Sequence, residues 1–490
     1  MIGLVHVLSL SLSLLISASK PASQPASKPI TPTTLPTYSK CDVTVDAGTV
    51  RHTISPLLMG FNMHTVHEPD SFWADGKVAE KLKEIKCGLL RFPDGEPTSY
   101  THWNDPISRG EVDTWDPKFD GKKGKPEEYT DVDEYMVQVR KIGCEPLIGI
   151  NMESGAKYHR DEEGLAEAKA LIQHCVDRKY NVKYWFLDNE TYLRGGNNHL
   201  PMTAEQYANY CNRYAEVLKS VDPNIQLVAN WERGWSKDWE TILTIAGKNI
   251  DIADMHMYWR GGGVSWPYWL QHNPMAPNGN AQDKERGITK LRPYSEIIRD
   301  FRESAKAMGK DIKVASMEWD IGPRPQPPLT PFQGALMQAE EFGQFINAGM
   351  DMACLWPMHW PGSFEYRELL NNKTREFNIN WTMFKMYSDV LGQDSVNSSS
   401  DVPLVPMVAA RSKDGNTLYI YLLRKSEDAP ALSTEITING FVAKSVKAIS
   451  LTADHYRSQT GKVIDLPVSG TDKLTIDLPA HSFTEVILKK

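Results

Sequence analysis

Short apolar runs alternate with longer amphipathic stretches between residues 57 and 360. The runs are rich in residues that favour strands, and they cover residues 57–62, 88–93, 145–151, 183–190, 225–231, 252–259, 312–320 and 352–360. Between them, stretches such as 131–142 and 204–220 repeat apolar positions every three to four residues, as surface helices do. Eight continuously apolar strands alternating with helices predict an α/β fold, a closed (β/α)8 TIM barrel.

The pattern changes near residue 400. Runs of alternating apolar and polar residues, such as 417–423 and 473–479, are separated there by Asn-Gly, Asp-Gly and Ser-Gly turns. Such alternation is typical of half-buried antiparallel strands. We therefore expect a barrel over residues 57–395 and a C-terminal antiparallel β-sandwich domain over 396–490. The strand-like residues 41–56 are expected to join that sandwich.

Two segments precede these domains. Residues 1–19 hold an apolar stretch followed by small residues, which indicates a secretory signal peptide, although its start lacks Lys and Arg. Residues 20–40 form a Pro/Ser/Thr-rich linker that cannot bury apolar surface. We expect a secreted protein, extracellular or periplasmic. No later segment approaches the roughly 20 apolar residues that a membrane span requires.

Charge and cysteine content narrow the function classes. The formal net charge is −8 and no run of Lys or Arg is present, so the clustered basic surface of a nucleic-acid binder is missing. The six cysteines permit disulfides in an exported chain without showing them. Cys87 and Cys144 each precede an apolar run and would lie at equivalent ends of neighbouring strands, but two small buried thiols are the favoured interpretation.

The C-terminal ends of the predicted strands carry the candidate chemistry, because barrel enzymes place their reactive groups there. The fourth and seventh strands each finish in a glutamate, Glu190 and Glu318. These strands lie on opposite sides of a closed eight-stranded sheet, so the two carboxylates can face each other across its mouth. Retaining glycoside hydrolysis needs such a pair roughly 5 Å apart, one to protonate the leaving oxygen and one to attack the anomeric carbon.

The segments around these glutamates resemble a known group. LDNE at 187–190 and MEWDIG at 317–322 are similar to the signatures of clan A retaining glycoside hydrolases, closest to family 44, the endoglucanases and xyloglucanases. LRFPDGEPTSYTHWND at 90–105 resembles a segment of families 44 and 51, the latter being α-L-arabinofuranosidases. The resemblance implies that Glu190 is the general acid/base and Glu318 the nucleophile. A two-carboxylate mechanism implies no cofactor.

The same resemblance implies roles for four neighbours. Asn189 would contact the sugar hydroxyl next to the anomeric carbon, and Tyr258 or His256 would steady the nucleophile. Arg91 would be the charge partner that keeps the nucleophile ionised.

Three positions depart from the family pattern. Asp94-Gly95-Glu96 stands where those families show Gly-Gly-Asn, and Asp320 replaces an Asn. Sugar contacts are therefore expected to be rearranged.

The tryptophans indicate the kind of substrate. All fourteen lie between Trp73 and Trp381, concentrated after strands, where their rings could stack on sugars. Long loops lined with Trp favour an extended cleft, hence an endo-acting enzyme on a polysaccharide or oligosaccharide substrate. The further candidate substrate-binding residues are Trp103, Trp231, Trp259, Trp319, Trp356 and His359.

Alternatives stay open at this level. An exo-acting α-L-arabinofuranosidase is one, and a hydrolase of a marine sulfated galactan such as agar or carrageenan is another, with sulfate neutralised by Arg194, Arg233 and Arg260. A third is an inactive carbohydrate-binding protein, against which the intact glutamates argue. The competing carboxylates are Glu153 and Glu232.

Two further patterns have a second interpretation. His64 and His67 could suggest a metal site, but such a site needs ligands from other strands and no such set is recognisable, so no metal is expected. Asn189-Glu190-Thr191 fits the glycosylation pattern N-x-[ST]. A glycan there would block the barrel mouth, so we interpret the segment as catalytic.

Overall fold

Eight parallel strands close into a barrel in this computed structural model, which describes residues 37–121, 128–193, 200–259, 265–271, 275–277, 291–322, 327–360, 366–371 and 373–490. The strands are β2 (Gly60–Asn62), β3 (Leu89–Phe92), β4 (Glu145–Ile150), β5 (Tyr184–Leu187), β6 (Gln226–Asn230), β7 (Ile252–Asp254), β11 (Lys313–Asp320) and β12 (Met352–Leu355). They pair in chain order, and β12 closes the ring on β2. The short β8 (Met257–Tyr258) continues beyond β7 and pairs with the end of β11. The predicted TIM barrel is confirmed.

The barrel interior is a packed core rather than a pore. Leu147, Phe186 and Val228, from three successive strands, are fully buried in one apolar cluster. At the top of this cluster the Arg91 guanidinium lies 4.1 Å from the centre of the Phe186 ring. The polar side chains at the strand ends therefore rest on a filled barrel.

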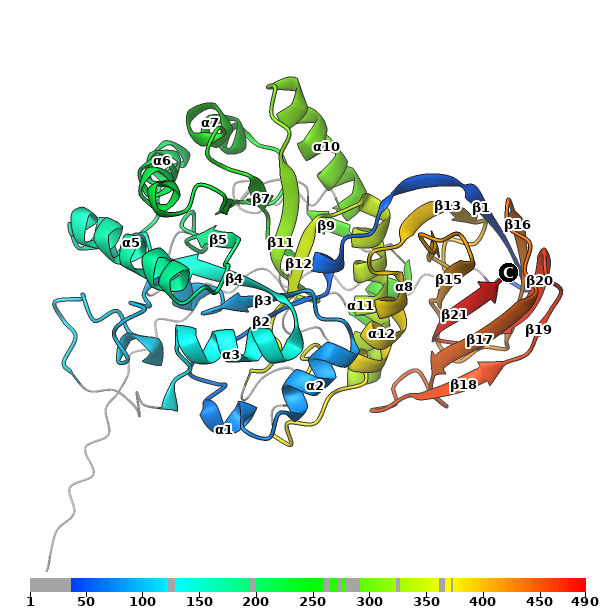
Figure 1. Ribbon diagram of the computed structural model, residues 1–490. Helices are drawn as coiled ribbons and strands as arrows, with labels where there is room; N and C mark the ends of the chain where they lie inside the picture. Colours follow the sequence, from blue (N-terminus) through cyan, green and yellow to red (C-terminus); the bar gives the residue numbers. More distant parts are fainter. Residues whose placement is uncertain are drawn as a thin grey trace, which may run out of the picture. The chain divides into compact units, whose positions relative to one another are not determined.

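Helices surround the strands (Figure 1). The longer ones are α2 (Lys77–Glu84), α3 (Val132–Ile142), α5 (Asp161–Asp177), α6 (Ala204–Val221), α7 (Lys237–Ala246), α10 (Tyr294–Ala307), α11 (Pro331–Ala348) and α12 (Asn380–Tyr387). The shorter ones are α1 (Asp70–Trp73), α4 (Glu153–Lys157) and α8 (Trp266–Gln271). Reciprocal capping boxes fix the starts of α3, α6 and α11.

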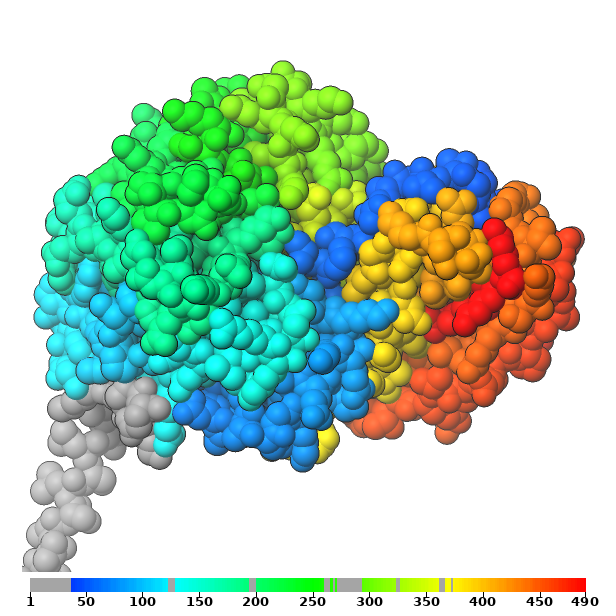
Figure 2. Space-filling view, viewed as in Figure 1, coloured from blue at the N-terminus to red at the C-terminus, as the bar shows by residue number. Residues whose placement is uncertain are grey.

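A second sheet of ten strands forms the sandwich. Its strands are β1 (Lys40–Thr53), β13 (Asp394–Ser400), β14 (Met407–Arg411), β15 (Thr417–Arg424), β16 (Leu432–Asn439), β17 (Ser445–Thr452), β18 (Lys462–Leu466), β19 (Val468–Ser469), β20 (Lys473–Leu478) and β21 (Ser482–Lys489). β1 pairs antiparallel with β13 and parallel with β16, and the other described pairs in this sheet are antiparallel. Figure 2 shows the blue N-terminal strand beside the orange C-terminal ones. The predicted β-sandwich is confirmed, with one parallel pairing in it.

The sandwich packs on the barrel through α11, which contacts β14, β15 and β21. The Lys425 ammonium lies 3.0 Å from the Glu340 carboxylate across this junction, and both side chains are almost fully buried. The Tyr421 hydroxyl of β15 donates to the Met386 carbonyl of α12 at 2.9 Å.

None of the helices in the described part of the chain has both the length and the apolar character needed to cross a bilayer.

Candidate active site

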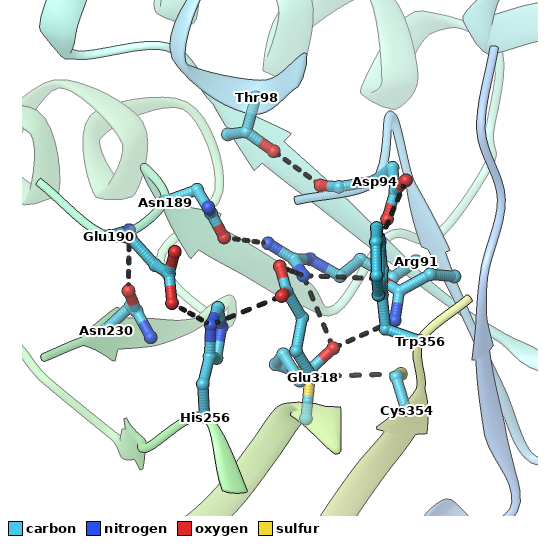
Figure 3. Close-up of polar contacts among 12 residues, drawn as sticks. Arg91, Asp94, Thr98, Asn189, Glu190, Asn230, His256, Glu318, Cys354 and Trp356 are labelled. Carbon is cyan, nitrogen blue, oxygen red and sulfur yellow. Dashed lines mark hydrogen bonds and ion pairs between the residues drawn. The ribbon is translucent and has the colours of Figure 1, made fainter. Parts of the chain in front are cut away.

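Glu190 and Glu318 converge at the C-terminal end of the barrel. Glu190 follows β5 and Glu318 lies near the end of β11. One carboxylate oxygen of each glutamate and a ring nitrogen of His256 all lie within 4.8 Å of one another. Figure 3 shows both carboxylates turned towards His256. This spacing is close to the roughly 5 Å that separates the carboxyl groups of retaining glycosidases.

Glu318 is held by two donors. The Arg91 guanidinium donates to its Oε1 at 3.2 Å, and the Tyr258 hydroxyl donates to its Oε2 at 2.8 Å. Burial raises the pKa of Glu318, and nearby His256 and Arg91 oppose that rise, whereas the charge of Glu190 adds to it. The donors therefore favour the ionised form that a nucleophile requires.

His256 lies between the two glutamates. Its Nδ1 is 2.8 Å from Oε1 of Glu190 and 3.5 Å from Oε2 of Glu318, while its Nε2 is 3.2 Å from Oδ2 of Asp254. Burial by itself lowers the pKa of His256, but the charges of Glu318, Asp254 and Glu190 outweigh burial and raise it to about 10. At neutral pH the ring is thus protonated, and it lies within 3.5 Å of Glu190, Asp254 and Glu318.

The chain turns sharply after β5. Asp188 and Glu190 have φ angles of 60° and 47°, the left-handed region that side chains rarely adopt. Oδ2 of Asp188 accepts backbone N–H bonds from Met152 at 2.7 Å and from Glu153 at 2.6 Å. These bonds anchor the turn to the start of α4 and so determine where Glu190 points.

Two amides complete the turn. Asn189 accepts from the Arg91 guanidinium through Oδ1 at 2.8 Å, and Asn230 accepts from the Glu190 backbone N–H at 2.7 Å. The Asn230 amide then donates to Asp254 at 2.6 Å. One polar network therefore connects the ends of β3, β5, β6 and β7.

Asp254 is a site residue that the sequence reasoning missed. It is fully buried, and its Oδ1 accepts the Met317 backbone N–H at 2.7 Å, next to the proposed nucleophile. The available signal was a carboxylate inside the apolar run 252–259. Such a group must be hydrogen-bonded if it is buried.

The segment after β3 approaches Glu318 closely. A Cβ atom built on Gly95 would lie 2.1 Å from Glu318 Oε1, so glycine is needed at this position. The preceding Asp94 accepts from the Trp356 indole N–H at 3.3 Å. Asp94 and Glu96 differ from the Gly-Gly-Asn pattern of the families, but the central glycine of that pattern is kept as Gly95.

A cavity of about 360 Å³ opens beside the glutamates. Its described lining consists of His64, Asp94, Glu96, Pro97, Tyr100, Glu111, Asn189, Glu190, Leu193, Glu318, Trp356 and Trp360. The cavity is therefore acidic, and Tyr100, Trp356 and Trp360 add aromatic rings to its lining. Its size falls within the roughly 300–1,000 Å³ of small-molecule sites.

Three of the tryptophans expected to contact sugar are in the core instead. Trp231, Trp259 and Trp319 are each at most 2% exposed, so the expectation of exposed stacking faces is wrong for them. Trp319 follows Glu318 in β11, and successive strand residues point to opposite faces. Its ring consequently packs on Phe345 of α11, with centroids 5.3 Å apart.

The remaining candidates divide into two groups. Trp356 lines the cavity. Trp103 instead lies over the ring of His174 in α5, with centroids 5.0 Å apart. His359 is buried beside Phe72, at 5.1 Å between ring centroids, and neither it nor Trp103 is part of the cavity lining.

The competing carboxylates and the arginines lie elsewhere. Glu153 is buried and accepts the Leu200 backbone N–H, and Glu232 is also buried; neither lines the cavity. Arg233 is buried and donates to the Tyr258 carbonyl at 2.8 Å. Arg194 and Arg260 fall outside the described residues.

Comparison with known proteins finds partial relatives and structures of similar fold. No protein-family model matches the chain. α-L-Arabinofuranosidase C of Emericella nidulans is 29% identical over 209 residues, which cover 37% of this chain and 39% of that protein. The chain thus spans about two fifths of the length of the first curated relatives that it matches.

Two solved structures share the fold. The α-L-arabinofuranosidase of Thermotoga maritima, in its arabinose complex, superposes with a TM-score of 0.69 at 20% identity, over 92% of this chain and 100% of that one. A family 44 xyloglucanase of Paenibacillus polymyxa, with xyloglucan, gives a TM-score of 0.63 at 13% identity, over 92% and 100%. These relatives and neighbours are glycoside hydrolases, and the resemblance to clan A is confirmed.

Proposed function

We propose that the chain is a retaining glycoside hydrolase with Glu190 as general acid/base and Glu318 as nucleophile. The observation that carries the proposal is the pair of carboxylates within 4.8 Å of each other, held by different partners. Arg91 and Tyr258 donate to Glu318, while the closest His256 contact is to Glu190. Different environments of this kind separate an acid from a nucleophile.

The reaction follows from these positions. A carboxylate oxygen of Glu318 forms a bond to the anomeric carbon as the bond to the leaving oxygen breaks, and Glu190 gives its proton to that oxygen. Glu190, now ionised, takes a proton from water as the water oxygen attacks the anomeric carbon and releases Glu318. The cationic His256 ring beside both groups offsets the charge that moves between them.

We propose terminal α-L-arabinofuranosyl units as the substrate, removed by exo action. Curated relatives carry the name arabinofuranosidase, and one from Bacillus subtilis is named an intracellular exo-α-(1→5)-L-arabinofuranosidase. The cavity of about 360 Å³ suits a small terminal unit. The burial of Trp231, Trp259 and Trp319 also removes most of the aromatic surface on which an extended cleft was expected.

Endo action on a polysaccharide such as xyloglucan is the second candidate. Trp356 and Trp360 both line the cavity, with ring centroids 5.3 Å apart, and form a two-ring wall against which a longer chain could lie. Of the three arginines considered for a sulfated galactan, Arg233 is turned into the protein, and Arg194 and Arg260 fall outside the described residues. We also propose secretion, on the signal-like residues 1–19.

Substitution of the two glutamates tests the mechanism. Glu190→Gln and Glu318→Gln should each reduce kcat on an aryl α-L-arabinofuranoside by at least about 10²-fold, since acid/base catalysis alone supplies roughly 10²–10⁴-fold. Glu153→Gln and Glu232→Gln are the matched controls, as buried glutamates near strand ends outside the cavity lining. Loss of activity in a control combined with full activity in Glu318→Gln would show that the assignment is wrong.

Product analysis tests the substrate. Arabinan and xyloglucan should be incubated with the wild type and the products separated by size. Release of arabinose alone from arabinan supports exo action. Oligosaccharides from xyloglucan, without arabinose from arabinan, would instead establish the second candidate.

A further inference from the structure

Two histidines and a glutamate meet at the edge of the cavity. The backbone N–H groups of His67 and Glu68 donate to the His64 carbonyl after β2, which forms one tight turn. The turn places both imidazoles on one side, stacked with centroids 4.4 Å apart. Oε1 of Glu111, from the segment after β3, lies 3.3 Å from Nε2 of His64 and 3.9 Å from Nε2 of His67.

His64 supplies a second, independent observation. It is 2% exposed, and within the described part of the chain neither of its ring nitrogens makes a hydrogen bond. A buried polar group without a hydrogen bond is costly. Its Nε2 instead points at the carboxylates of Glu111 and Asp94, with an Asp94 oxygen at 3.8 Å. An imidazole presented in this way has the chemistry of a metal ligand.

The charge around the cluster also favours a cation. The described lining of the cavity contains Asp94, Glu96, Glu111, Glu190 and Glu318, and neither Lys nor Arg. Arg91 and His256, behind that lining, contact the catalytic glutamates.

We propose that His64, His67 and Glu111 bind a divalent transition-metal ion of the zinc class, with Asp94 within reach as a fourth ligand. Two imidazoles and a carboxylate are an established ligand set for Zn²⁺, with bonds of about 2.0–2.2 Å. Ligand atoms around such a tetrahedral ion lie about 3.4 Å apart. The present separations of 3.3, 3.8 and 3.9 Å need only small side-chain movements to reach that geometry.

A metal here would do two things that the protein alone does not. It would tie Glu111, and with it the segment after β3, to the turn that follows β2. It would also place positive charge in the cavity wall, because His64, Asp94 and Glu111 all belong to the lining. The lack of ligands from other strands was the reason to expect no metal at His64 and His67. Glu111 and Asp94 supply such ligands from the loop after β3.

Metal binding by the full-length protein tests the proposal. Chelator-treated, dialysed protein is titrated with Zn²⁺ against a chromophoric chelator, and bound metal is counted by elemental analysis. We expect one Zn²⁺ per chain, and visible absorption bands of four-coordinate Co²⁺ when Co²⁺ replaces it. His67→Gln and Glu111→Gln should each weaken Zn²⁺ binding at least about ten-fold.

His174→Gln is the matched control, because His174 also lies against a carboxylate, Asp133 at 2.7 Å, outside the cavity lining. It should bind Zn²⁺ like the wild type. The side chains of His67 and Glu111 are 24% and 37% exposed, so their variants should fold, which circular dichroism checks.

Three results would overturn the proposal. The first is no Zn²⁺ bound by the wild type, and the second is unchanged affinity in both His67→Gln and Glu111→Gln. The third is binding abolished by Glu318→Gln but kept in His67→Gln, which would place the ion at the group formed by Glu190, His256 and Glu318. Because the readout is metal stoichiometry, it does not depend on whether the glycosidase proposal holds.

Discussion

Gly95 lies so close to Glu318 that no larger side chain fits at this position. Its substitution by Ala would put a methyl group 2.1 Å from Oε1 of a carboxylate that Arg91 and Tyr258 hold on the other sides. We expect Gly95→Ala to lower kcat/KM about 100-fold or more, because displacements near 1 Å at a reacting group have that effect.

The control for this variant is Gly155→Ala, where the new methyl group would meet nothing closer than 3.5 Å. Steady-state kinetics on an aryl arabinofuranoside and thermal unfolding should be measured for both. Wild-type kcat/KM in a folded Gly95→Ala protein would contradict the placement of Glu318 as nucleophile.

Protonation of the His256 ring makes the stability of the folded protein depend on pH. Its pKa is about 10 in the folded protein, against an ordinary value of 6.5. Between these values the folded chain keeps a proton that the unfolded chain has released, so this stabilisation is complete below pH 6.5 and is lost as the pH rises through about 10. The free energy of unfolding should therefore fall with pH in this window, by up to about 1.4 kcal/mol per pH unit.

Urea unfolding at pH 7 and pH 9 measures this effect. The variant His256→Gln lacks the titrating group, so its free energy of unfolding should change less over the same interval. Equal changes in the wild type and the variant would show that His256 does not carry the proton.

At the scale of elements, the sequence predicted the barrel strands. It did not predict which residues of each strand point to the barrel interior and which point to the helices. Strands covered on both faces give continuous apolar runs, and all eight runs became barrel strands. A glutamate ending such a run is conspicuous, which is why Glu190 and Glu318 could be found. The packing of Trp319 against a helix could not be predicted, because every residue of a continuous run is apolar and the pattern does not distinguish the two faces of the strand.

Loops set a different limit on prediction. Glu111 meets His64 and His67 only because the loop after β3 folds back over the end of β2. No periodic pattern encodes such a return, so the sequence offered two ligands of the candidate metal site and no third. Asp254 was hidden for a related reason, since its partners Asn230 and Met317 come from β6 and β11.

The turn after β5 provides a prediction for an element. Asp188 accepts hydrogen bonds through both carboxylate oxygens, from the Met152 and Glu153 N–H groups on Oδ2 and from the Ser99 hydroxyl and the Asn189 N–H on Oδ1. Asp188→Asn turns one of these two acceptors into an NH₂ donor, so the bonds on that side are lost. We expect about 1.5–3 kcal/mol less stability, the range for hydrogen bonds to charged groups, and a lower kcat because Glu190 loses its support.

The comparison for this variant is Asp222→Asn, at the exposed end of α6, where one backbone N–H bond is made to Asn224. Urea unfolding should show little change there. If Asp188→Asn were equally harmless to stability and kcat, the turn would not depend on these bonds.

At the scale of the whole molecule, the barrel and the sandwich meet across a buried ion pair. Lys425→Met would leave Glu340 buried without its cation, and we expect a loss of about 3–5 kcal/mol in the free energy of unfolding. The double variant Lys425→Met/Glu340→Leu should regain most of it, since it removes both charges. Urea unfolding of the single and double variants checks this.

An exposed pair in the sandwich gives the reference value. Lys473 lies 2.7 Å from Glu435 with 62% of its side chain exposed, and Lys473→Met should cost less than about 1 kcal/mol. Similar losses in Lys425→Met and Lys473→Met would mean that the junction does not depend on its ion pair.

The burial of Asn189 has a consequence for how this protein can be made. The residue is 1% exposed and hydrogen-bonded to Arg91, yet with Glu190 and Thr191 it spells a glycan acceptor. An oligosaccharyltransferase acts on such a tripeptide while the chain is still extended. In a eukaryotic expression host, sugar attachment would compete with closure of the barrel, and every chain modified at Asn189 would be lost to folding. A bacterial host without that transferase avoids the competition.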